Sequence, residues 1–564
     1  MLDGVHMFLD FMSEVEGILK EGLDRCGLSI SLENSLDLSP HADLSTTVAF
    51  RLSPALKKSP KDIAAEIYSA MGSPSRWVDR AELVGPYINF YMSRSFLDDV
   101  VVRAQGEDAW RGRMSGSVIV EHTSANPDGP LHVGHIRNSV IGDTIVRILR
   151  RAGYSVEAQY YVNDMGRQTA MVVWGCDHLA LDGSKPDHAI ARVYIAAHRI
   201  MNERPELAAE VDELMRRYES RDPEIVEKFQ RAAKYAISGI ESTLHRMNIH
   251  HDSYKWESEF VWDGSVDEIL EMLERTGRTV LKDGALQLDL SEEGFEKSLV
   301  LRRADGTTLY TTRDLAYHKW KAENYERVVE VLGADHKLVS AQLRTALRIL
   351  GIKEPEVVIF EFVSLPDGSM STRRGKFISA DELLDEVEKQ AYIEVTKRRP
   401  EMDDDFRKEV AGKVAVGAVR YDIVRVSADK ATMFDWKTAL DFEKLSAPFI
   451  QYSHARACSI LKRAGDIDEF DPGLLRDDYE IALIKKIAEF DLVIDRAARE
   501  LKPHQLATYA RELAERFNLF YRYDPVLDAR PNELRNARLA LVRASRNALS
   551  ATLDTLGIEA PESM

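Results

Sequence analysis

The sequence predicts a multidomain α/β protein with a parallel sheet at its centre, and three observations support this fold class. The chain has 564 residues, too many for a single hydrophobic core. In its middle part, apolar strand-like runs alternate with helical patterns, the order that a doubly wound parallel sheet requires. From about residue 380 onwards, apolar residues recur at helical spacing, which indicates an all-α region.

The composition limits the classes of protein to which the chain can belong. Hydrophobic residues make up 45% and charged residues 30% of it, as in ordinary globular proteins. No apolar run has the length of a membrane span, and Cys26, Cys176 and Cys458 are far apart, which argues against a disulfide framework or a structural zinc site. The net charge of −18 neither excludes nor favours a nucleic-acid partner, because local basic stripes suffice at cellular ionic strength.

The N-terminal part, residues 1–112, is predicted to be a separate α+β domain. It mixes helical patterns such as PKDIAAEIYSAM with strand-like stretches such as GPYINFYMS.

Residues 113–380 are predicted to form a Rossmann-type domain. A strand at Ser117–Val120 leads into a long helix, and the strands ERVVEVLG and EVVIFEFVS flank the helix AQLRTALRILG. Ligands of such sheets bind at the carboxyl ends of the strands. Between about 170 and 290 the sequence is mostly helical and highly charged, without strand–helix alternation, so we expect an insertion that lies outside the sheet.

The last two parts are predicted to be helical: a connecting region, 381–447, and a bundle, 448–564. In the bundle, apolar residues recur at spacings of three and four, namely Leu506, Tyr509, Leu513, Phe517 and Phe520.

Two histidines in the stretch PLHVGHIRN mark the start of the helix that follows the first strand. Pro130 suits the first helical position, and Gly153 suits the end of the helix. His132 and His135 would then lie on one face at the positive end of a helix, where anions bind. On this stretch alone, two ordinary solvent-facing or hydrogen-bonded histidines are the simpler interpretation.

A second stretch, GSMSTRRGKFI at 368–378, is a small basic loop after the last predicted strand. The two stretches together resemble the HIGH and KMSKS signatures of class I aminoacyl-tRNA synthetases. Further stretches narrow the resemblance to the arginyl-tRNA synthetase family: VEHTSANPDGPLHVGHIRNSVIGD, YYVNDMGRQ, TLYTTRDLAYH, FISADELLDEV, QYSHARACSI and LGIEAPESM. With the N-terminal ADLSTTVAFRLSPALKKSPKDIAAEI, the resemblance covers nearly the whole chain.

The resemblance implies that arginine and ATP, bound with Mg²⁺, form arginyl-adenylate, and that the arginyl group passes to the 3′ end of tRNA(Arg). It also implies that activation requires bound tRNA. The substrate carboxylate attacks the α-phosphorus, so the protein has to align the reactants and stabilise charge. His132 and His135 would bind phosphate oxygens, and Gly134 would leave room for adenine. The other residues implied for ATP are Gly333, Asp335, His336, Met370 and Ser371.

A guanidinium is bound best by carboxylates, which pair with it as a bidentate fork. Tyr310 and Asp314, four residues apart, share one helical face, and Glu121 ends the first strand. By resemblance, Glu121 and Asp314 bind the guanidinium and Tyr310 lines the pocket. The resemblance also implies contacts between the substrate and Ser124, Asn126, His135 and Gln342, with Asn126 and Gln342 on the α-amino group. Asp314 could instead form an ordinary surface ion pair with its neighbour Arg313.

The basic loop departs from the family pattern. Where the family has Lys-Met-Ser-Lys-Ser, residues 369–373 read SMSTR, so both lysines are missing. We predict that one or more of the remaining cations, Arg373, Arg374 and Lys376, stabilises the departing pyrophosphate. These cations could instead bind only the acceptor stem of the tRNA.

Two parts of the chain are predicted to bind tRNA. The resemblance assigns the C-terminal bundle to the anticodon loop, where Tyr452 and Arg456 offer a stacking face and a cation. Tyr452 could alternatively belong to the core of the bundle. The other candidates are Phe449, where the family usually has a tyrosine, Met564 near it, and Asn89, Phe90 and Tyr91 in the N-terminal domain.

Other functions fit the sequence less well. A synthetase for glutamate would need basic residues in place of Glu121 and Asp314, one for cysteine would need zinc ligands, and a nucleotidyltransferase would have no use for the C-terminal bundle. A catalytically silent tRNA-binding paralogue is favoured only by the altered basic loop. We therefore expect an arginine-activating enzyme whose partners are arginine, ATP and tRNA(Arg). It is expected to act as a cytoplasmic monomer, without a membrane or a protein-bound metal.

Overall fold

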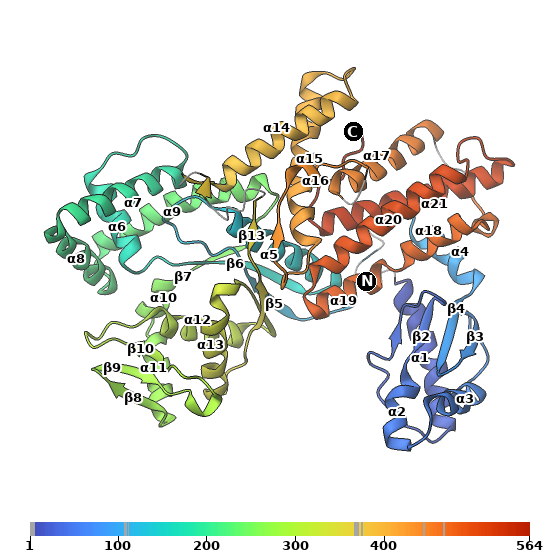
Figure 1. The fold of residues 1–564 in the computed structure, drawn as a ribbon, viewed down its shortest axis with the longest axis horizontal. Coiled ribbons are helices and arrows are strands. Elements are labelled where there is room, and N and C mark those ends of the chain that lie inside the picture. Colours follow the sequence, from blue (N-terminus) through green and yellow to red (C-terminus); the bar gives the residue numbers. More distant parts are fainter. Residues whose placement is uncertain are drawn as a thin grey trace.

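The computed structural model describes residues 6–106, 110, 112–365, 372–373, 376–443, 446–465 and 469–564, and for residues 372–373 and 376–377 it describes the backbone alone. Figure 1 shows an N-terminal domain, a central sheet with two extensions, and a C-terminal helical bundle. Within these residues, no helix is both long and apolar enough to cross a membrane.

The N-terminal domain is the α+β unit that the sequence predicts. Its antiparallel sheet consists, in spatial order, of β1 (Leu36–Asp37), β2 (Leu44–Thr46), β4 (Tyr87–Met92) and β3 (Val78–Val84). Its helices are α1 (Phe8–Arg25), α2 (Val48–Leu56), α3 (Pro60–Ala70) and α4 (Arg94–Arg103). The stretches PKDIAAEIYSAM and GPYINFYMS form α3 and β4, as predicted.

A parallel sheet lies at the centre of the chain. In spatial order its strands are β12 (Glu356–Phe360), β11 (Arg327–Gly333), β5 (Ser117–Glu121), β6 (Ser155–Val162) and β7 (Ser253–Trp256). The register of β11 on β5 places Glu330 beside Glu121. Because every pair of neighbours is parallel, the carboxyl ends of the strands meet at one edge.

The long helix after β5 is α5 (Val133–Ala152), and Gly153 ends it with a φ of 112°. The N-cap is His132, so Pro130 lies two residues before the cap and the prediction that it takes the first helical position is wrong. The reason is that the imidazole of His132 accepts the first free backbone N–H groups of the helix, as a capping side chain does.

The predicted helical insertion is present between β6 and β7. It consists of α6 (Arg167–His178), α7 (Pro186–Glu203), η1 (Pro205–Leu207), α8 (Ala208–Glu219) and α9 (Pro223–Arg246). The expectation that the whole stretch to residue 290 lies outside the sheet is wrong, because β7 pairs in parallel with β6. None of the four residues of β7 is buried, so the strand has no apolar alternation to detect.

A second extension lies between β7 and β11 in the chain (Figure 1). It contains α10 (Glu257–Trp262), α11 (Ser265–Arg275), η2 (Ser291–Glu293) and an antiparallel sheet of β10 (Leu299–Arg302), β9 (Ala285–Leu288) and β8 (Thr279–Lys282). Helix α12 (Tyr310–Asn324) then leads to β11, and η3 (Ala334–His336) and α13 (Lys337–Ile349) connect β11 to β12.

Beyond the sheet the chain is almost entirely helical, as predicted. The helices are α14 (Ala380–Arg398), α15 (Asp404–Val424), α16 (Trp436–Ala439), α17 (Ala447–Ala464), η4 (Pro472–Leu474), α18 (Asp478–Ala488), α19 (Phe490–Glu500), α20 (Pro503–Tyr523) and α21 (Asn532–Thr555). Two short strand pairs accompany them: β13 (Val363–Ser364) with β16 (Thr432–Met433), and β14 (Thr372–Arg373) with β15 (Lys376–Phe377). The predicted apolar residues of α20 are all buried.

A buried ion pair joins the central domain to the helical part. Arg420 of α15 is fully buried, and its guanidinium donates to the carboxylate of Asp143 on α5. The same guanidinium donates to the carbonyl oxygens of Leu556 at 2.9 Å and Met247 at 2.8 Å. One side chain therefore holds α5, α15 and the ends of α9 and α21 together.

We expect Asp143→Asn to lower the free energy of unfolding by about 3–5 kcal/mol, because it leaves a buried guanidinium without its counter-charge. Denaturant titration followed by fluorescence measures the effect. The matched control is Asp554→Asn, since Asp554 pairs with Arg151 while 65% exposed, and such pairs contribute about 0–1 kcal/mol. Equal losses in the two variants would contradict the assignment.

Candidate active site at the carboxyl edge of the central sheet

The structure brings most of the predicted residues of the central domain to the carboxyl edge of the sheet. They lie at the ends of β5 and β11, at the start of α5, and on α12 and α13, namely Glu121, His132, His135, Tyr310, Asp314, Gly333 and Gln342. Parallel α/β sheets bind their ligands at this edge.

The two histidines at the start of α5 form a stacked pair. Their ring centroids are 3.7 Å apart, and the ring planes differ by 16°. Nδ1 of His132 accepts hydrogen bonds from the backbone N–H groups of Gly134 at 3.0 Å and His135 at 3.3 Å. Nδ1 of His135 accepts one from the backbone N–H of His132 at 3.3 Å, so the two imidazoles form a reciprocal capping box.

These hydrogen bonds fix the tautomer of both rings. A ring nitrogen that accepts a hydrogen bond carries no proton, so the proton of each neutral imidazole lies on Nε2. Burial lowers the pKa of His132, and burial together with His132 lowers the pKa of His135 to about 3. Both rings are therefore neutral at physiological pH, and the N-terminus of α5 carries two neutral Nε2–H groups.

Gly134 is required by this stack. A Cβ at that position would lie 2.9 Å from Cε1 and 3.1 Å from Nδ1 of His132, closer than side chains normally approach. Its predicted role beside adenine stays a prediction.

The histidine pair is also joined to the segment that follows the basic loop. His132 forms an isolated antiparallel bridge with Ser379, and the N–H of Ala380 donates to the carbonyl oxygen of Leu131 at 2.7 Å. Of the predicted loop residues, Met370, Ser371 and Arg374 lie outside the described residues, and Arg373 and Lys376 are described by their backbone in β14 and β15. The segment directly after the loop, Ser379 and Ala380, therefore lies against the start of α5.

Asp314 is a partly buried carboxylate with no ion-pair partner among the residues that the structure describes. The alternative that Arg313 neutralises it is wrong, because Nη1 of Arg313 lies 3.1 Å from Oε1 of Glu257. Burial raises the pKa of Asp314 to about 7. His318 and Lys321 oppose this rise, and Glu121 and Glu330 add to it. Tyr310, one turn earlier on α12, is 52% exposed and open to a ligand.

Glu121, in contrast, already has a counter-ion. Its Oε2 lies 2.5 Å from Nζ of Lys321, and its Oε1 accepts a hydrogen bond from the hydroxyl of Ser124 at 3.1 Å. Lys321 also lies 2.7 Å from Oε1 of Glu330, which in turn pairs with His318.

Sequence reasoning missed Lys321, His318 and Glu330. The signal was present in part, because residues 314, 318 and 321 follow the four- and three-residue spacing of one helical face. The partner Glu330 could not be identified without the register of β11 on β5.

The residues predicted for the α-amino group have partners of their own. Nδ2 of Asn126 donates to Oε1 of Gln168 at 3.4 Å, and the buried Gln342 donates to the carbonyl oxygen of Lys297 at 2.9 Å. The hydroxyl of Ser124 accepts the backbone N–H of Tyr161 at 3.0 Å. The hydroxyl of Tyr161, which sequence reasoning also missed, is buried with no hydrogen-bond partner in the described part of the chain.

The loop after β11 is open to solvent. The side chains of Asp335 and His336 are 65% and 59% exposed, and they lie 3.6 Å apart. A Cβ on Gly333 would lie 2.6 Å from Oδ1 of Asp335, so the glycine lets the Asp335 carboxylate approach the backbone closely. The loop is thus accessible to a ligand at the carboxyl edge.

On the C-terminal bundle, Tyr452 and Arg456 lie together on α17. Tyr452 is 41% exposed, so the alternative that it belongs to the core is wrong. The guanidinium of Arg456 lies 4.7 Å from the ring centroid of Tyr452 and 5.1 Å from that of the exposed Tyr521 on α20, which sequence reasoning missed. Phe449 is partly buried against the core, and Met564 is buried.

In the N-terminal domain, the prediction that Phe90 contacts tRNA is wrong, because its side chain is fully buried in the domain core. Asn89 is 6% exposed, and the hydroxyl of Tyr91 donates to Glu82 at 3.0 Å. The exposed aromatic of β4 is Tyr87, whose ring lies 5.2 Å from that of Phe50.

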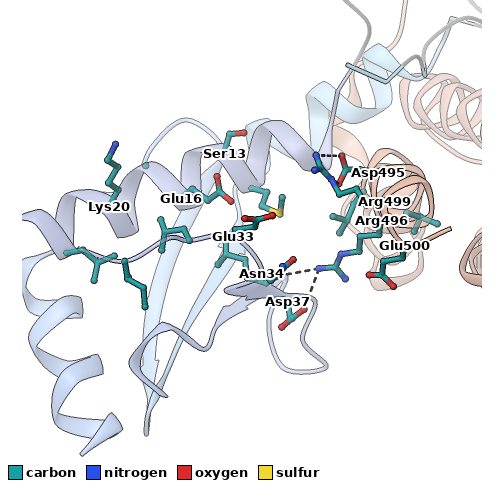
Figure 2. A pocket seen from close by; sticks show the side chains of 18 of the residues that line it. Ser13, Glu16, Lys20, Glu33, Asn34, Asp37, Asp495, Arg496, Arg499 and Glu500 are labelled. Carbon is teal, nitrogen blue, oxygen red and sulfur yellow. Dashed lines mark hydrogen bonds and ion pairs between the residues drawn. The ribbon is translucent and has the colours of Figure 1, made fainter. Parts of the chain in front are cut away.

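A cavity of about 1380 Å³ lies between α1 and α19, lined by residues of the N-terminal domain and of the C-terminal bundle. Figure 2 shows Glu16, Glu33 and Asp37 on the N-terminal side, and Asp495, Arg496 and Arg499 on the other. Arg496 bridges the two sides through the carbonyl oxygen of Leu36 at 3.3 Å. No predicted site residue lines this cavity, which lies at the junction of the N-terminal domain and the C-terminal bundle.

Models of known protein families match three parts of the chain. Residues 100–436 match the catalytic domain of class I tRNA synthetases (R), residues 450–564 match the DALR anticodon binding domain, and residues 14–92 match the arginyl tRNA synthetase N-terminal domain.

Whole proteins are similar as well. A protein named arginine–tRNA ligase from Methanothrix thermoacetophila is 92% identical over 558 residues, which cover 99% of this chain and 100% of the relative. One of the same name from Methanococcoides burtonii is 54% identical and covers the same shares. The solved Thermus thermophilus arginyl-tRNA synthetase has a TM-score of 0.86 and 30% identity, covering 98% of this chain and 100% of that one.

We expect both histidines to be neutral Nε2–H tautomers at pH 7, and His135 to stay neutral down to about pH 4, because its pKa is lowered to about 3. Long-range ¹H–¹⁵N NMR of histidine-labelled protein reports tautomer and protonation. His132→Gln and His135→Gln assign the signals. An imidazolium at either position at pH 7 would rule out the neutral pair.

Proposed function

The chain belongs to the arginyl-tRNA synthetase family and is an arginine–tRNA ligase, and from this premise we propose how its residues perform the reaction. The observation that carries the proposal is the pairing of two charge environments at one sheet edge. The start of α5 holds two neutral imidazoles at a helix N-terminus, and Asp314 is a carboxylate without an ion-pair partner in the described part of the chain.

ATP, bound with Mg²⁺, would lie at the N-terminus of α5 with its phosphates near Nε2–H of His132 and His135. The positive end of the helix adds to this attraction. As the arginine carboxylate attacks the α-phosphorus, these fixed donors stabilise the charge that develops on the phosphates. Gly134 and the loop residues Gly333, Asp335 and His336 complete the nucleotide site, with Met370 and Ser371.

Arginine would place its guanidinium against Asp314, with Tyr310 covering it and Glu121 as a second acceptor. Support for this comes from Asp314, a largely desolvated carboxylate that has no ion-pair partner among the residues that the structure describes. At the other end of the substrate, Asn126 and Gln342 would bind the α-amino group, with Ser124 and His135 beside it.

The departing pyrophosphate would be stabilised by one or more of Arg373, Arg374 and Lys376. The bridge between His132 and Ser379 supports this, because it holds the segment directly after the loop close to where the phosphates would lie. These residues act as electrostatic groups and form no bond to the substrate.

For tRNA, we propose that α17 and α20 bind the anticodon loop. Tyr452 and Arg456 carry the contact, and Phe449 and Met564 pack beneath it. Stacked and cation–π groups of this kind bind unstacked bases. Asn89 and Tyr91 would contact the tRNA from the N-terminal domain. The three cysteines are unpaired, which supports a cytoplasmic enzyme, and we propose that it acts as a monomer.

Activation is proposed to require bound tRNA, and ATP–pyrophosphate exchange tests this. We expect arginine-dependent exchange with transcribed tRNA(Arg) and none without it. Periodate-oxidised tRNA(Arg), which binds but cannot be charged, should support exchange, and Tyr452→Ala should raise the tRNA concentration that is needed. Full exchange without tRNA would contradict the requirement. Exchange with another amino acid in place of arginine would contradict the substrate.

We expect Asp314→Asn to lower kcat/KM for arginine roughly 30- to 900-fold, which corresponds to about 2–4 kcal/mol for a lost buried charge pair. In the wild-type enzyme the KM for arginine should fall as pH rises through about 7, because Asp314 must lose its proton to pair with guanidinium. Asp314→Asn should remove this pH dependence. Glu323→Gln, at the exposed end of α12, is the control.

A further inference from the structure

Two glutamates lie side by side on the central sheet. Glu121 of β5 and Glu330 of β11 are direct neighbours in the register of the parallel pair, and both are mostly buried, with side chains 12% and 4% exposed. Like charges directly opposite each other on a sheet are destabilising. A buried cation is therefore needed between them.

Lys321 supplies that cation from the helix that covers this face. Its side chain is fully buried, and Nζ lies 2.5 Å from Glu121 and 2.7 Å from Glu330. The ammonium also lies 3.8 Å from the ring centroid of Tyr317, and the hydroxyl of Tyr317 donates to Gln159 on β6 at 2.6 Å. Contacts on all sides hold the ammonium in one place.

The charges around Asp314 can be paired one by one. Glu121 and Glu330 face Lys321 and His318, and Glu257 faces Arg313. Glu330 raises the pKa of His318, against the effect of burial. Burial raises the pKa of Glu257 to about 8, and it raises the pKa of the neighbouring phenols Tyr161 and Tyr317 well above their usual value, so both tyrosines stay neutral. With His318 protonated, Lys321 and His318 balance Glu121 and Glu330, and Asp314 has no ion-pair partner among the described residues.

We infer that Lys321 is a positioning residue that determines specificity: its ammonium neutralises the Glu121–Glu330 pair, so that Asp314 alone faces the substrate side chain with an uncompensated charge. The site then accepts a side chain with a single positive charge and disfavours a neutral isostere. Lys321 and Ser124 also fix the orientation of the Glu121 carboxylate, through Oε2 and Oε1 respectively. This inference rests on the proposed place of Asp314 and Glu121 in the arginine pocket.

The test is the pH dependence of kcat/KM for arginine in Lys321→Met, measured by tRNA charging. Without the ammonium, one more uncompensated negative charge acts on Asp314, so the pH of half-maximal kcat/KM should rise by about 1–3 units. The double variant Lys321→Met/Glu330→Gln removes one charge of each sign and should return the midpoint towards that of the wild type. Lys319→Met, a partly exposed lysine on the same helix, should leave the midpoint unchanged.

An active Lys321→Met with an unmoved midpoint would overturn the inference, because a merely structural role lowers activity equally at all pH values. If Lys321→Met does not fold, Glu330→Gln tests the inference instead, because it removes a negative charge near Asp314 where Lys321→Met removes a positive one. It should lower the midpoint and reduce the discrimination between arginine and its neutral isostere citrulline, and no change in either would overturn the inference. A wild-type enzyme without any pH dependence linked to Asp314 would instead contradict the proposed pocket itself.

Discussion

The buried ion pair between Asp143 and Arg420 fixes the relation between the two halves of the molecule. Asp143 lies in the middle of α5, and the histidine pair lies at the start of the same helix. Arg420 also holds the end of α21, close to the C-terminus of the bundle. Through Arg420, the proposed anticodon-binding part is therefore joined to the helix that carries the histidine pair.

The reaction edge separates its charges in a way that matches the two substrates. At the start of α5 the rings are neutral, so phosphates bound as proposed would meet N–H donors and the positive end of a helix. Beside α12, Glu121, Glu257 and Glu330 pair with cations of that helix, whereas Asp314 has no ion-pair partner among the described residues. Both environments depend on burial, since the low pKa of His135 and the raised pKa of Asp314 have desolvation as their largest cause.

The sequence by itself determined the features that local chemistry controls. The strand before the histidines, the end of α5 at Gly153 and the helical face shared by Tyr310 and Asp314 all follow from short-range spacing, and the structure confirms them. The apolar periodicity of α20 likewise predicted a buried helix, because a 3.6-residue period needs no knowledge of the partner. The motifs also predicted the family, and the relative from Methanothrix thermoacetophila confirms it over almost the whole chain.

Only the tertiary structure decided which groups meet. Strand β7 forms because it pairs with the edge of β6, and Phe90 is buried because the strand alternation of β4 turns it to the core. His132 caps α5 because the helix begins at Val133, three residues after the predicted start at Pro130. Arg313 pairs with Glu257 instead of its neighbour Asp314, and Lys321 lies between glutamates from two strands. Such contacts join residues far apart in the chain, and their strength depends on desolvation, which no local pattern encodes.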